Sequence, residues 1–433
     1  MKNALKIAAV TSLAAIALTA CNTTGGGEKI NKKRDRTDIK VGLICLHDEN
    51  STYDKNFIDS MNRAVENLGL ADGQLIVKTG IAEDNAAKEA ADDLCDKGCD
   101  IIFADSFGHE PFILESAKNH PSVDFCHSTG TQAGTAGVSN YHNAFASIYE
   151  GRFLAGVAAG YKLQELKKQK PSTPSKVGYV GAFTYAEVIS GYTSWYLGVK
   201  SVVPDVTMEV QFTGSWYDEV AEKEAANKLI DNGAVVLSQH ADSWGAPTAC
   251  EERNVPDVSY NGTTYNACPN TYIAASKIDW TPYYEYAILA RIQGKEIAAN
   301  YTSTLVDGGV QVLEVGSAAT SRTQAQVNFV AGQLKREEVD VFDCDTFTVT
   351  VDKTDANPLN WLNANAQVDG EEVPAGTKKS GKLTSYLADV EDFGDYIGDT
   401  EVVLDGAFRE SLFRSAPYFD IQIDGITLLN TKF

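Results

Sequence analysis

The chain has 433 residues, a formal net charge of −22 at pH 7 and 43% hydrophobic residues. This length is more than one hydrophobic core usually serves, so we expect two domains. The acidic balance argues against nucleic acid or an anionic lipid surface as the partner.

The N-terminal residues have the pattern of a bacterial lipoprotein signal peptide. Two lysines come before an apolar run that is too short to span a bilayer, and residues 18–20 then lead to Cys21. We expect residues 1–20 to be removed and Cys21 to be lipidated, which would hold the chain at the outer face of a membrane. The alternative is an ordinary secretory signal with an incidental cysteine. Residues 21–38 are Gly-rich and then basic, which is typical of a flexible tether.

Besides Cys21 the chain has seven cysteines, an odd number that cannot all pair internally. Cys45 and Cys126 lie in apolar, strand-like runs and are predicted to be buried thiols. Cys250 and Cys268 flank one loop segment, where a disulfide and two free thiols are equally open. Two further cysteines stand four residues apart without nearby histidines, so we predict no metal site.

From residue 39 onward, short apolar runs alternate with amphipathic helices. The first series has predicted strands at residues 39–46, 75–77, 100–104 and 123–127, and predicted helices at 57–68, 86–94 and 112–119. The second series has predicted helices at 150–166, 188–203 and 219–232, and predicted strands at 176–181, 207–213 and 234–238. This alternation predicts an α/β fold with two similar lobes, each a mostly parallel sheet flanked by helices.

The later part of the chain gives a weaker signal. Its predicted elements are strands at 272–280 and 310–315 and helices at 283–297 and 324–338. Residues 359–387 are rich in Gly, Asn and Lys and are predicted to be irregular, and residues 384–409 are left without an assignment. Three glycines four or five residues apart in the helix at 150–166 predict close backbone packing there.

In open parallel sheets, ligands collect at the loops beyond the carboxyl ends of the strands. This rule nominates the loops at residues 47–53, 106–109, 183–185, 214–217 and 239–244. Between two such sheets these loops would face each other across a cleft. Ser106 and Phe107, in the second of these loops, are candidate ligand contacts.

A set of short motifs then follows in order with consistent spacing between residues 39 and 345. The motifs are residues 101–108, Phe125-Cys126-His127-Ser128-Thr129-Gly130, residues 149–156, residues 176–180, Thr213-Gly214-Ser215-Trp216 and Gln239-His240-Ala241-Asp242-Ser243. Together they resemble the basic membrane protein (BMP) family. Its members are substrate-binding lipoproteins of ABC importers, and those characterised bind purine nucleosides or purine bases.

The resemblance implies a type I periplasmic-binding fold, with two lobes that close around a ligand by a hinge motion. Three crossings between the lobes are expected near residues 137–143, 274–280 and 305–312. Lobe 1 would comprise residues 39–138 and 278–308, and lobe 2 residues 139–277 and 309–433. The stretch at 384–409 resembles an insertion into the family pattern.

The resemblance also implies an aromatic sandwich for a flat base. Residues 54–57 resemble the family's Asp-Lys-Ser-Phe, whose aromatic residue stacks on the base and falls at Phe57 here. Gly214-Ser215-Trp216 matches a Gly-Ser-aromatic motif, which makes Trp216 the second face. Stacking contributes about 1–3 kcal/mol per ring. Phe57 also lies on the apolar stripe of its helix, so a core position remains equally open.

Polar contacts carried over from the family depart from the nucleoside-binding pattern at two positions. Thr129 and Asn261 stand where many members carry acidic residues, which weakens the grip on a ribose diol and favours a purine base such as adenine. His127 and Gln239 belong to the motifs of that branch. Asp242 is able to accept a hydrogen bond from an exocyclic amine, with a helix N-cap as its alternative role.

Three further residues complete the candidate site. Asp48 is the candidate for an aspartate that follows the family's first strand. Lys277 lies near the family's ligand lysine, and otherwise is a solvated strand residue. His240 is equally open to a structural hydrogen bond and to a ligand contact.

The sequence therefore predicts a lipid-anchored, monomeric, extracytoplasmic binding protein that delivers a purine base or nucleoside to an ABC permease, without a cofactor. A membrane-anchored sensor or adhesin for another heteroaromatic ligand, such as a flavin, is the alternative. A nucleoside-processing enzyme is disfavoured because the sequence has no Asp-rich metal loop, no Gly-x-Ser-x-Gly elbow and no phosphate loop.

Overall fold

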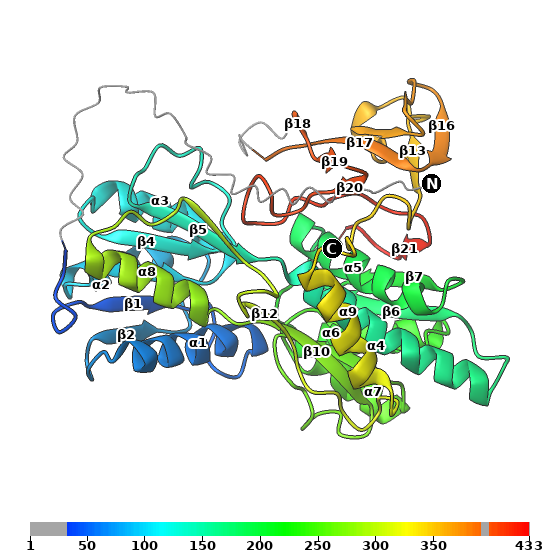
Figure 1. Cartoon of the computed structure of the whole chain (residues 1–433), viewed down its shortest axis with the longest axis horizontal. Coiled ribbons are helices and arrows are strands. Elements are labelled where there is room, and N and C mark those ends of the chain that lie inside the picture. The colour runs from blue at the N-terminus through cyan, green and yellow to red at the C-terminus, as the bar shows by residue number, and fades with distance from the viewer. Residues whose placement is uncertain (1–32, 391–397, 433) are drawn as a thin grey trace, which may run out of the picture. The chain divides into compact units, whose positions relative to one another are not determined.

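A computed structural model describes residues 33–390 and 398–432. Its first sheet has six strands, all paired in parallel, in the order β11-β5-β4-β3-β1-β2 (Figure 1). The strands are β1 (Val41–Ile44), β2 (Leu75–Lys78), β3 (Ile101–Ala104), β4 (Asp124–Ser128), β5 (Tyr141–Ala146) and β11 (Asn300–Ser303). The helices beside this sheet are α1 (Thr52–Leu68), α2 (Asn85–Asp96), α3 (Glu110–Asn119) and α8 (Thr281–Gln293).

The second sheet has seven strands in the order β12-β10-β9-β8-β6-β7-β21, and only β12 runs antiparallel to its neighbour. The strands are β6 (Lys176–Gly181), β7 (Thr207–Phe212), β8 (Leu237–His240), β9 (Asp257–Tyr260), β10 (Tyr272–Ile278), β12 (Val310–Val312) and β21 (Ile426–Leu428). Its helices are α4 (Ile148–Gln169), α5 (Ala186–Val202), α6 (Glu219–Asp231), α7 (Gly245–Arg253) and α9 (Thr323–Lys335).

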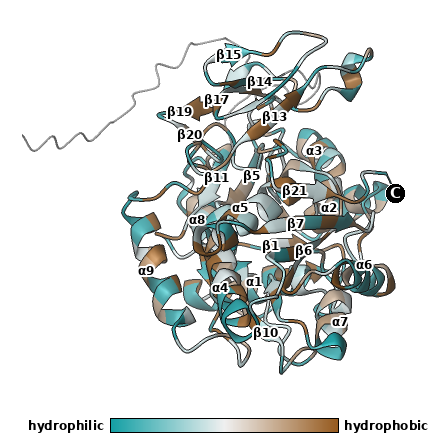
Figure 2. Ribbon diagram, turned by 90° about the vertical axis from the view of Figure 1, so that its right-hand side faces the viewer, coloured by the Kyte–Doolittle hydropathy of each residue, from teal (hydrophilic) through white to brown (hydrophobic). Residues whose placement is uncertain are grey.

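Burial confirms the predicted α/β architecture. Every residue of β1, β3, β4 and β5 is buried, as expected for parallel strands that are covered on both faces. The surrounding helices carry hydrophilic residues toward solvent, and Figure 2 shows hydrophilic and hydrophobic positions interspersed along α9. No helix among the described residues combines the length and the apolar character needed to cross a membrane.

Helices α4 and α5 pack backbone to backbone, as the glycines of the sequence predict. A Cβ atom built at Gly156 would overlap the carbonyl oxygen of Trp195, and one at Gly198 would overlap that of Phe153. Only glycine permits this approach, so either position is intolerant of a larger residue. The contact joins α4 to the C-terminal half of α5.

Helix α1 begins five residues before the predicted start at Phe57. The side chain of Ser51 accepts a hydrogen bond from the amide of Asp54, at 3.2 Å, and so caps the helix. Residues that were expected to form a loop therefore form the first helical turn.

The chain passes between the two sheets at three places before residue 313. Strand β5 pairs with β4, with Phe125 opposite Tyr141, so residues 141–146 belong to the first sheet. The first passage therefore follows residue 146, later than the expected crossing at 137–143. The other two lie between β10 and α8 and between β11 and β12, at or close to the expected positions. The exact division into lobes stays a prediction.

Residues after 343 form an additional β-rich segment, which we call the C-terminal extension. The prediction of an irregular stretch at 359–387 is wrong, because residues 366–388 hold four short strands. The strands of the extension are β13 (Val349–Asp352), β14 (Ala366–Val368), β15 (Glu371–Glu372), β16 (Lys378–Gly381), β17 (Leu383–Ala388), β18 (Thr400–Glu401), β19 (Val403–Leu404) and β20 (Ala407–Phe408). The extension ends in β21, which pairs with β7 of the second sheet (Figure 1).

The cysteine predictions are settled in part. Cys45 and Cys126 are buried thiols, as predicted, and Cys250 and Cys268 are both free, so no bridge joins them. The predicted signal peptide, Cys21 and most of the predicted tether lie outside the described residues.

Candidate functional site

Loops from the two sheets meet around a small enclosed space, which we call the central cavity. Its volume is about 20 Å³, room for a single water molecule. It is lined by Leu46, Tyr53, Ser106, Phe107, Glu187, Trp216, His240, Asp242 and Tyr260. These residues lie at or beyond the carboxyl ends of β1, β3, β6, β7, β8 and β9, where open parallel sheets bind ligands.

Five of the sequence-predicted residues line this cavity: Ser106, Phe107, Trp216, His240 and Asp242. Trp216 is half-buried, and its ring packs edge-on against Phe183 with centroids 5.0 Å apart. Its carbonyl oxygen accepts a hydrogen bond from the amide of Asp242 at 2.9 Å. This backbone bond ties the loop after β7 to the loop after β8, so the aromatic wall and the carboxylate are held in one unit.

The carboxyl groups of the cavity are unusually easy to protonate. Burial, reinforced by the charges of Asp54, Glu222 and Glu187, raises the pKa of Asp242 well above its usual value. Burial also raises the pKa of Glu187 to about 7. Near neutral pH Glu187 can therefore accept a hydrogen bond or, when protonated, donate one, and the raised pKa of Asp242 favours its protonated, donating form.

His240 contacts both Glu187 and the ring of Tyr260, whose centroid lies 4.7 Å from that of the imidazole. Its Nε2 lies 3.3 Å from Oε1 of Glu187, and its Nδ1 has no hydrogen-bond partner among the described residues. Burial, followed by the positive charge of Arg152, lowers the pKa of His240 well below its usual value. The imidazole is therefore neutral and offers one donor and one acceptor. It makes a structural hydrogen bond and also lines the cavity, so the geometry accommodates both of its expected roles.

The aromatic residue that α1 places at the cavity is Tyr53, which the sequence reasoning missed. Its hydroxyl donates to the carbonyl oxygen of Asp105 at 2.7 Å. Phe57, one turn further along the same face, is fully buried and stacks on Trp280 with ring centroids 4.5 Å apart. The structure thus places Phe57 in the core, the alternative role left open by its apolar stripe. Tyr53 lies one turn before Phe57 on the same helix, and that spacing was the available signal for it.

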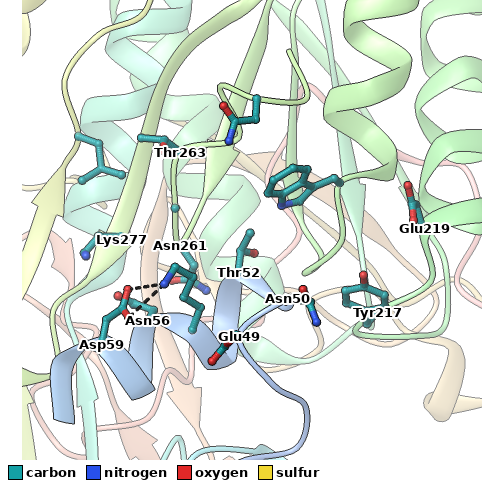
Figure 3. Close-up of a pocket in the computed structure, with 15 residues that line it drawn as sticks. Glu49, Asn50, Thr52, Asn56, Asp59, Tyr217, Glu219, Asn261, Thr263 and Lys277 are labelled. Atoms are coloured by element: carbon teal, nitrogen blue, oxygen red, sulfur yellow. Dashed lines mark hydrogen bonds and ion pairs between the residues drawn. The ribbon is translucent and has the colours of Figure 1, made fainter. Parts of the chain in front are cut away.

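Asn261 and Lys277 come together in a second, larger space, the outer polar cavity, with a volume of about 680 Å³ (Figure 3). Helix α1 contributes to both cavities, because Thr52 lines the outer one and the next residue, Tyr53, lines the central one. Asn261 is 4% exposed, and its Nδ2 has no partner among the described residues. Partial burial lowers the pKa of Lys277.

Figure 3 shows how the outer polar cavity is arranged. Asp59, Asn56 and Lys277 stand on one side of the view, and Tyr217 and Glu219 on the other. The dashed lines mark the ion pair between Lys55 and Asp59, at 3.0 Å. The cavity therefore offers amide groups, hydroxyls and charges of both signs, which suits a polar, hydroxyl-bearing group.

The remaining predicted residues lie elsewhere. Thr129, in a left-handed conformation with φ of 73°, lines a third cavity beside Phe107. His127 is fully buried, bonds the carbonyl oxygen of Ser106 at 2.8 Å through Nε2, and has its pKa lowered by burial to about 4. Gln239 is buried and donates to the carbonyl oxygen of Ala241 at 2.7 Å. His127 and Gln239 therefore hydrogen-bond the backbone of the loops after β3 and β8 and do not line the central cavity.

The structure also shows where Asp48 lies and tests the capping role considered for Asp242. Asp48 is exposed and accepts a hydrogen bond from the amide of Asn50 at 3.0 Å, in a groove at the rim. The N-cap of α7 is Trp244 rather than Asp242, so the capping alternative for Asp242 does not apply.

One group of potential metal-ligating side chains occurs among the described residues: Cys45, Asp54 and Asp105, with ligand atoms within 4.8 Å of one another. Hydrogen bonds from His47 lower the pKa of Asp54 against the effect of burial, whereas burial and the charge of Asp54 raise that of Asp105. Oxygen atoms of both carboxyl groups already accept backbone amides. This pattern fits an ionised Asp54 beside a protonated Asp105 better than a metal site.

A family model described as ABC transporter substrate-binding protein PnrA-like matches residues 41–342. The chain belongs to this family, the Bmp family. The resemblance stated from the sequence motifs is thereby confirmed, and the chain is an ABC transporter substrate-binding protein, a class that acts outside the cytoplasm.

Several curated proteins are similar to this chain. A purine-binding protein of Brucella abortus is 27% identical over 391 residues, which cover 87% of this chain and 98% of the relative. The putative ABC transporter glucose-binding protein TsgA13 of Haloferax volcanii is 29% identical over 56% of this chain and 59% of its own length. The nucleoside-binding protein BmpA of Lactococcus lactis is 23% identical over 58% of this chain and 68% of its own length.

Solved structures confirm the fold. A solute-binding protein from Conexibacter woesei matches with a TM-score of 0.58 at 21% identity, covering 70% of this chain and 98% of the other. One from Aeropyrum pernix matches with a TM-score of 0.59 at 15% identity, covering 70% and 93%. The type I periplasmic-binding fold predicted from the sequence is therefore correct.

Proposed function

We propose that the chain captures a purine base in the central cavity and delivers it to an ABC permease, while a lipid on Cys21 holds it at the membrane. The observation that carries this proposal is the composition of the central cavity. Rings from both sheets, Tyr53 and Phe107 on one side and Trp216 on the other, surround two buried carboxyl groups. A flat, nitrogen-rich ring offers its π faces to the aromatic side chains and its N–H groups to the carboxyl groups.

The carboxyl groups suit the edge of a purine. Asp242 and Glu187 accept hydrogen bonds from ring and exocyclic N–H groups when ionised, and their raised pKa values allow either to donate to a ring nitrogen when protonated. The neutral His240 is hydrogen-bonded to Glu187 through Nε2 and so orients that carboxyl group. Buried groups of this kind discriminate strongly, because a ligand that lacks the matching atom leaves them unpaired.

Binding requires the two sides of the cavity to separate, because 20 Å³ is far too small for a purine. The contacts between the two sides include long hydrogen bonds, which are weak enough to break. One is between Thr52 of α1 and the carbonyl oxygen of Asp242, which accepts from the amide at 3.4 Å and from the hydroxyl at 3.1 Å. Hinge opening followed by closure around the ligand is the motion that this fold supports.

We expect a base to bind more tightly than its nucleoside. The outer polar cavity has the room for a ribose, but Asn261 offers it a neutral amide where a carboxylate would accept from both hydroxyls of the diol. Hydrogen bonds to charged groups contribute about 1.5–3 kcal/mol, against 0.5–1.5 kcal/mol for neutral pairs. The names of the Brucella and Lactococcus relatives, purine-binding and nucleoside-binding, support this ligand class.

The deciding experiment starts from mass spectrometry of any small molecule that co-purifies with the protein. Calorimetric titrations of the ligand-free protein with adenine, guanosine, glucose and riboflavin then rank the candidate classes. We expect adenine to bind most tightly and to be recovered unchanged after long incubation. Tighter binding of glucose, of riboflavin or of guanosine would overturn the base assignment, and conversion of the ligand would indicate an enzyme.

The proposed anchor has a separate test. Full-length protein with Cys21→Ser should leave the detergent phase in a phase-partition experiment and appear in the aqueous phase. The matched control is Cys95→Ser, a half-buried thiol of α2, which should partition as the wild type does. Retention of Cys21→Ser in the detergent phase would contradict lipidation at this residue.

A further inference from the structure

Three cavities follow one another along the carboxyl ends of the two sheets. In the second sheet, the order β10-β9-β8-β6 carries Lys277 and Asn261 of the outer polar cavity first, then His240 of the central cavity, and then Tyr185 beyond β6. Tyr185 lines a third space, which we call the side cavity, with a volume of about 410 Å³. The central cavity therefore lies between a polar space and the side cavity.

The first sheet shows the same order independently. Asn50, beyond β1, lines the outer polar cavity, and Thr129, beyond β4, lines the side cavity. Phe107, beyond the intervening strand β3, lines both the central and the side cavity. Glu187 of the second sheet is shared in the same way, so the two spaces meet along a common boundary made by both lobes.

The far wall of the side cavity comes from the C-terminal extension, through Arg414, Ala416 and Pro417. These residues lie beyond the segment matched by the family model, which ends at residue 342. The wall is a built structure. The Nη2 group of Arg414 donates to the carbonyl oxygen of Pro417 at 3.0 Å, and the hydroxyl of Ser415 donates to Oδ1 of Asn300, on β11, at 3.0 Å.

The side cavity is suited to an apolar, preferably aromatic, group. The rings of Phe107 and Tyr185 face it with centroids 5.3 Å apart, and Ala186, Ala416 and Pro417 add apolar surface. The guanidinium of Arg414, which also lines the side cavity, adds a positive charge that attracts an aromatic ring.

Glu187 determines how a ligand would pass from one space to the other. Its carboxyl group borders both cavities and lies 3.3 Å from His240. A secondary exocyclic amine that donates its single N–H to Glu187 places its nitrogen at this boundary. The second substituent of that nitrogen then extends into the side cavity, while the ring system stays against Trp216.

We propose that the side cavity is a substituent-binding subsite, and that the preferred ligand is a purine whose exocyclic amine carries an aromatic or other bulky apolar group. This inference rests on the proposed function, because it assumes the purine in the central cavity. It adds a specificity element made by a segment that lies outside the matched family region.

The test compares adenine, N6-methyladenine and N6-benzyladenine by calorimetry with the ligand-free wild-type protein. Burial of the phenyl group should make N6-benzyladenine bind at least about tenfold more tightly than adenine, with N6-methyladenine between them. Affinity for N6-benzyladenine equal to or below that for adenine overturns the subsite. If adenine itself does not bind, the proposed function fails first, and the two failures are thereby distinguished.

A cavity-filling variant gives the matching test on the protein side. Ala186→Phe, at the half-buried first residue of α5, places a ring in the side cavity. We expect it to bind adenine within about twofold of wild type and N6-benzyladenine about tenfold more weakly. The control is Ala364→Phe, which fills a separate cavity of about 330 Å³ that shares no lining residue with the central one. Equal effects of Ala186→Phe on both ligands, or none on either, contradict the proposal, and the ligand series alone decides it if this variant does not fold.

Discussion

Replacement of Trp216 by alanine should weaken purine binding strongly while the fold persists. The indole lines the central cavity and is backed by Phe183, so its removal takes away one complete face of the ligand site. Stacking of a base on an aromatic side chain contributes about 1–3 kcal/mol, which corresponds to a loss of affinity of about 5- to 150-fold. The backbone carbonyl of residue 216 still accepts from the amide of Asp242, so the loop that carries the carboxylate keeps its position.

The assay is calorimetric titration with adenine, together with chemical denaturation of the same preparation. Trp361→Ala is the matched control, because Trp361 is a half-buried indole of the C-terminal extension and lies outside the central cavity. We expect the control to bind adenine as the wild type does. Unchanged affinity in Trp216→Ala, with wild-type affinity in the control, would refute the stacking role and with it the aromatic-wall argument.

Three further predictions separate the roles assigned above. Phe57→Ala should lower the free energy of unfolding by about 3–5 kcal/mol with little change in the affinity of the folded protein for adenine. Tyr53→Ala should instead mainly weaken adenine binding. Denaturation and titration of both variants distinguish a residue of the core from a residue of the binding site. Asn261→Asp should raise affinity for guanosine relative to adenine by about tenfold or more, measured by competition, and no change would remove the outer polar cavity from ribose recognition. Burial raises the pKa of Glu410 to about 8 in the folded protein, so the folded state holds a proton that the unfolded state releases, and stability should fall as pH rises from about 4.5 to about 8. Glu410→Gln should therefore gain stability relative to wild type between about pH 5 and about pH 8, as measured by denaturation curves at both values. A constant difference between the two proteins would contradict the shift.

The sequence predicted those parts of the fold in which the local pattern of apolar residues matches the burial of the element in the folded protein. The fully apolar run at residues 101–104 could only be a buried strand, and the loops that follow such strands contain most of the central cavity. The start of α1 was misplaced because its first turn is polar and depends on one capping hydroxyl, that of Ser51. The choice of Phe57 came from the family's Asp-Lys-Ser-Phe motif, whereas the aromatic residue of α1 that lines the central cavity is Tyr53.

The C-terminal extension escaped sequence reasoning for a different physical reason. Its strands contain two to six residues and are joined by turns with left-handed residues such as Asn363 and Asp369. Alternation of apolar and polar residues over so few positions is indistinguishable from loop composition. The side-cavity wall at residues 414–417 has no secondary structure of its own, and its position depends on long-range contacts such as that between Ser415 and Asn300.

These contacts also indicate where a ligand enters. The extension bonds the first sheet through Ser415 and Asn300, and its last strand, β21, pairs with β7 of the second sheet. The extension thus connects the two lobes beside the side cavity. If the lobes separated at the side cavity, this connection would be stretched. A gap at the outer polar cavity stretches non-covalent contacts such as the hydrogen bond between Thr52 and Asp242 and the ring contact between His47 and Tyr217. We therefore infer that the ligand enters from the outer polar cavity with its apolar substituent leading. A reducible crosslink between cysteines placed at positions 47 and 217, whose native rings have centroids 5.6 Å apart, should then block adenine uptake and restore it on reduction, whereas unimpeded uptake in the crosslinked form would place the entrance elsewhere.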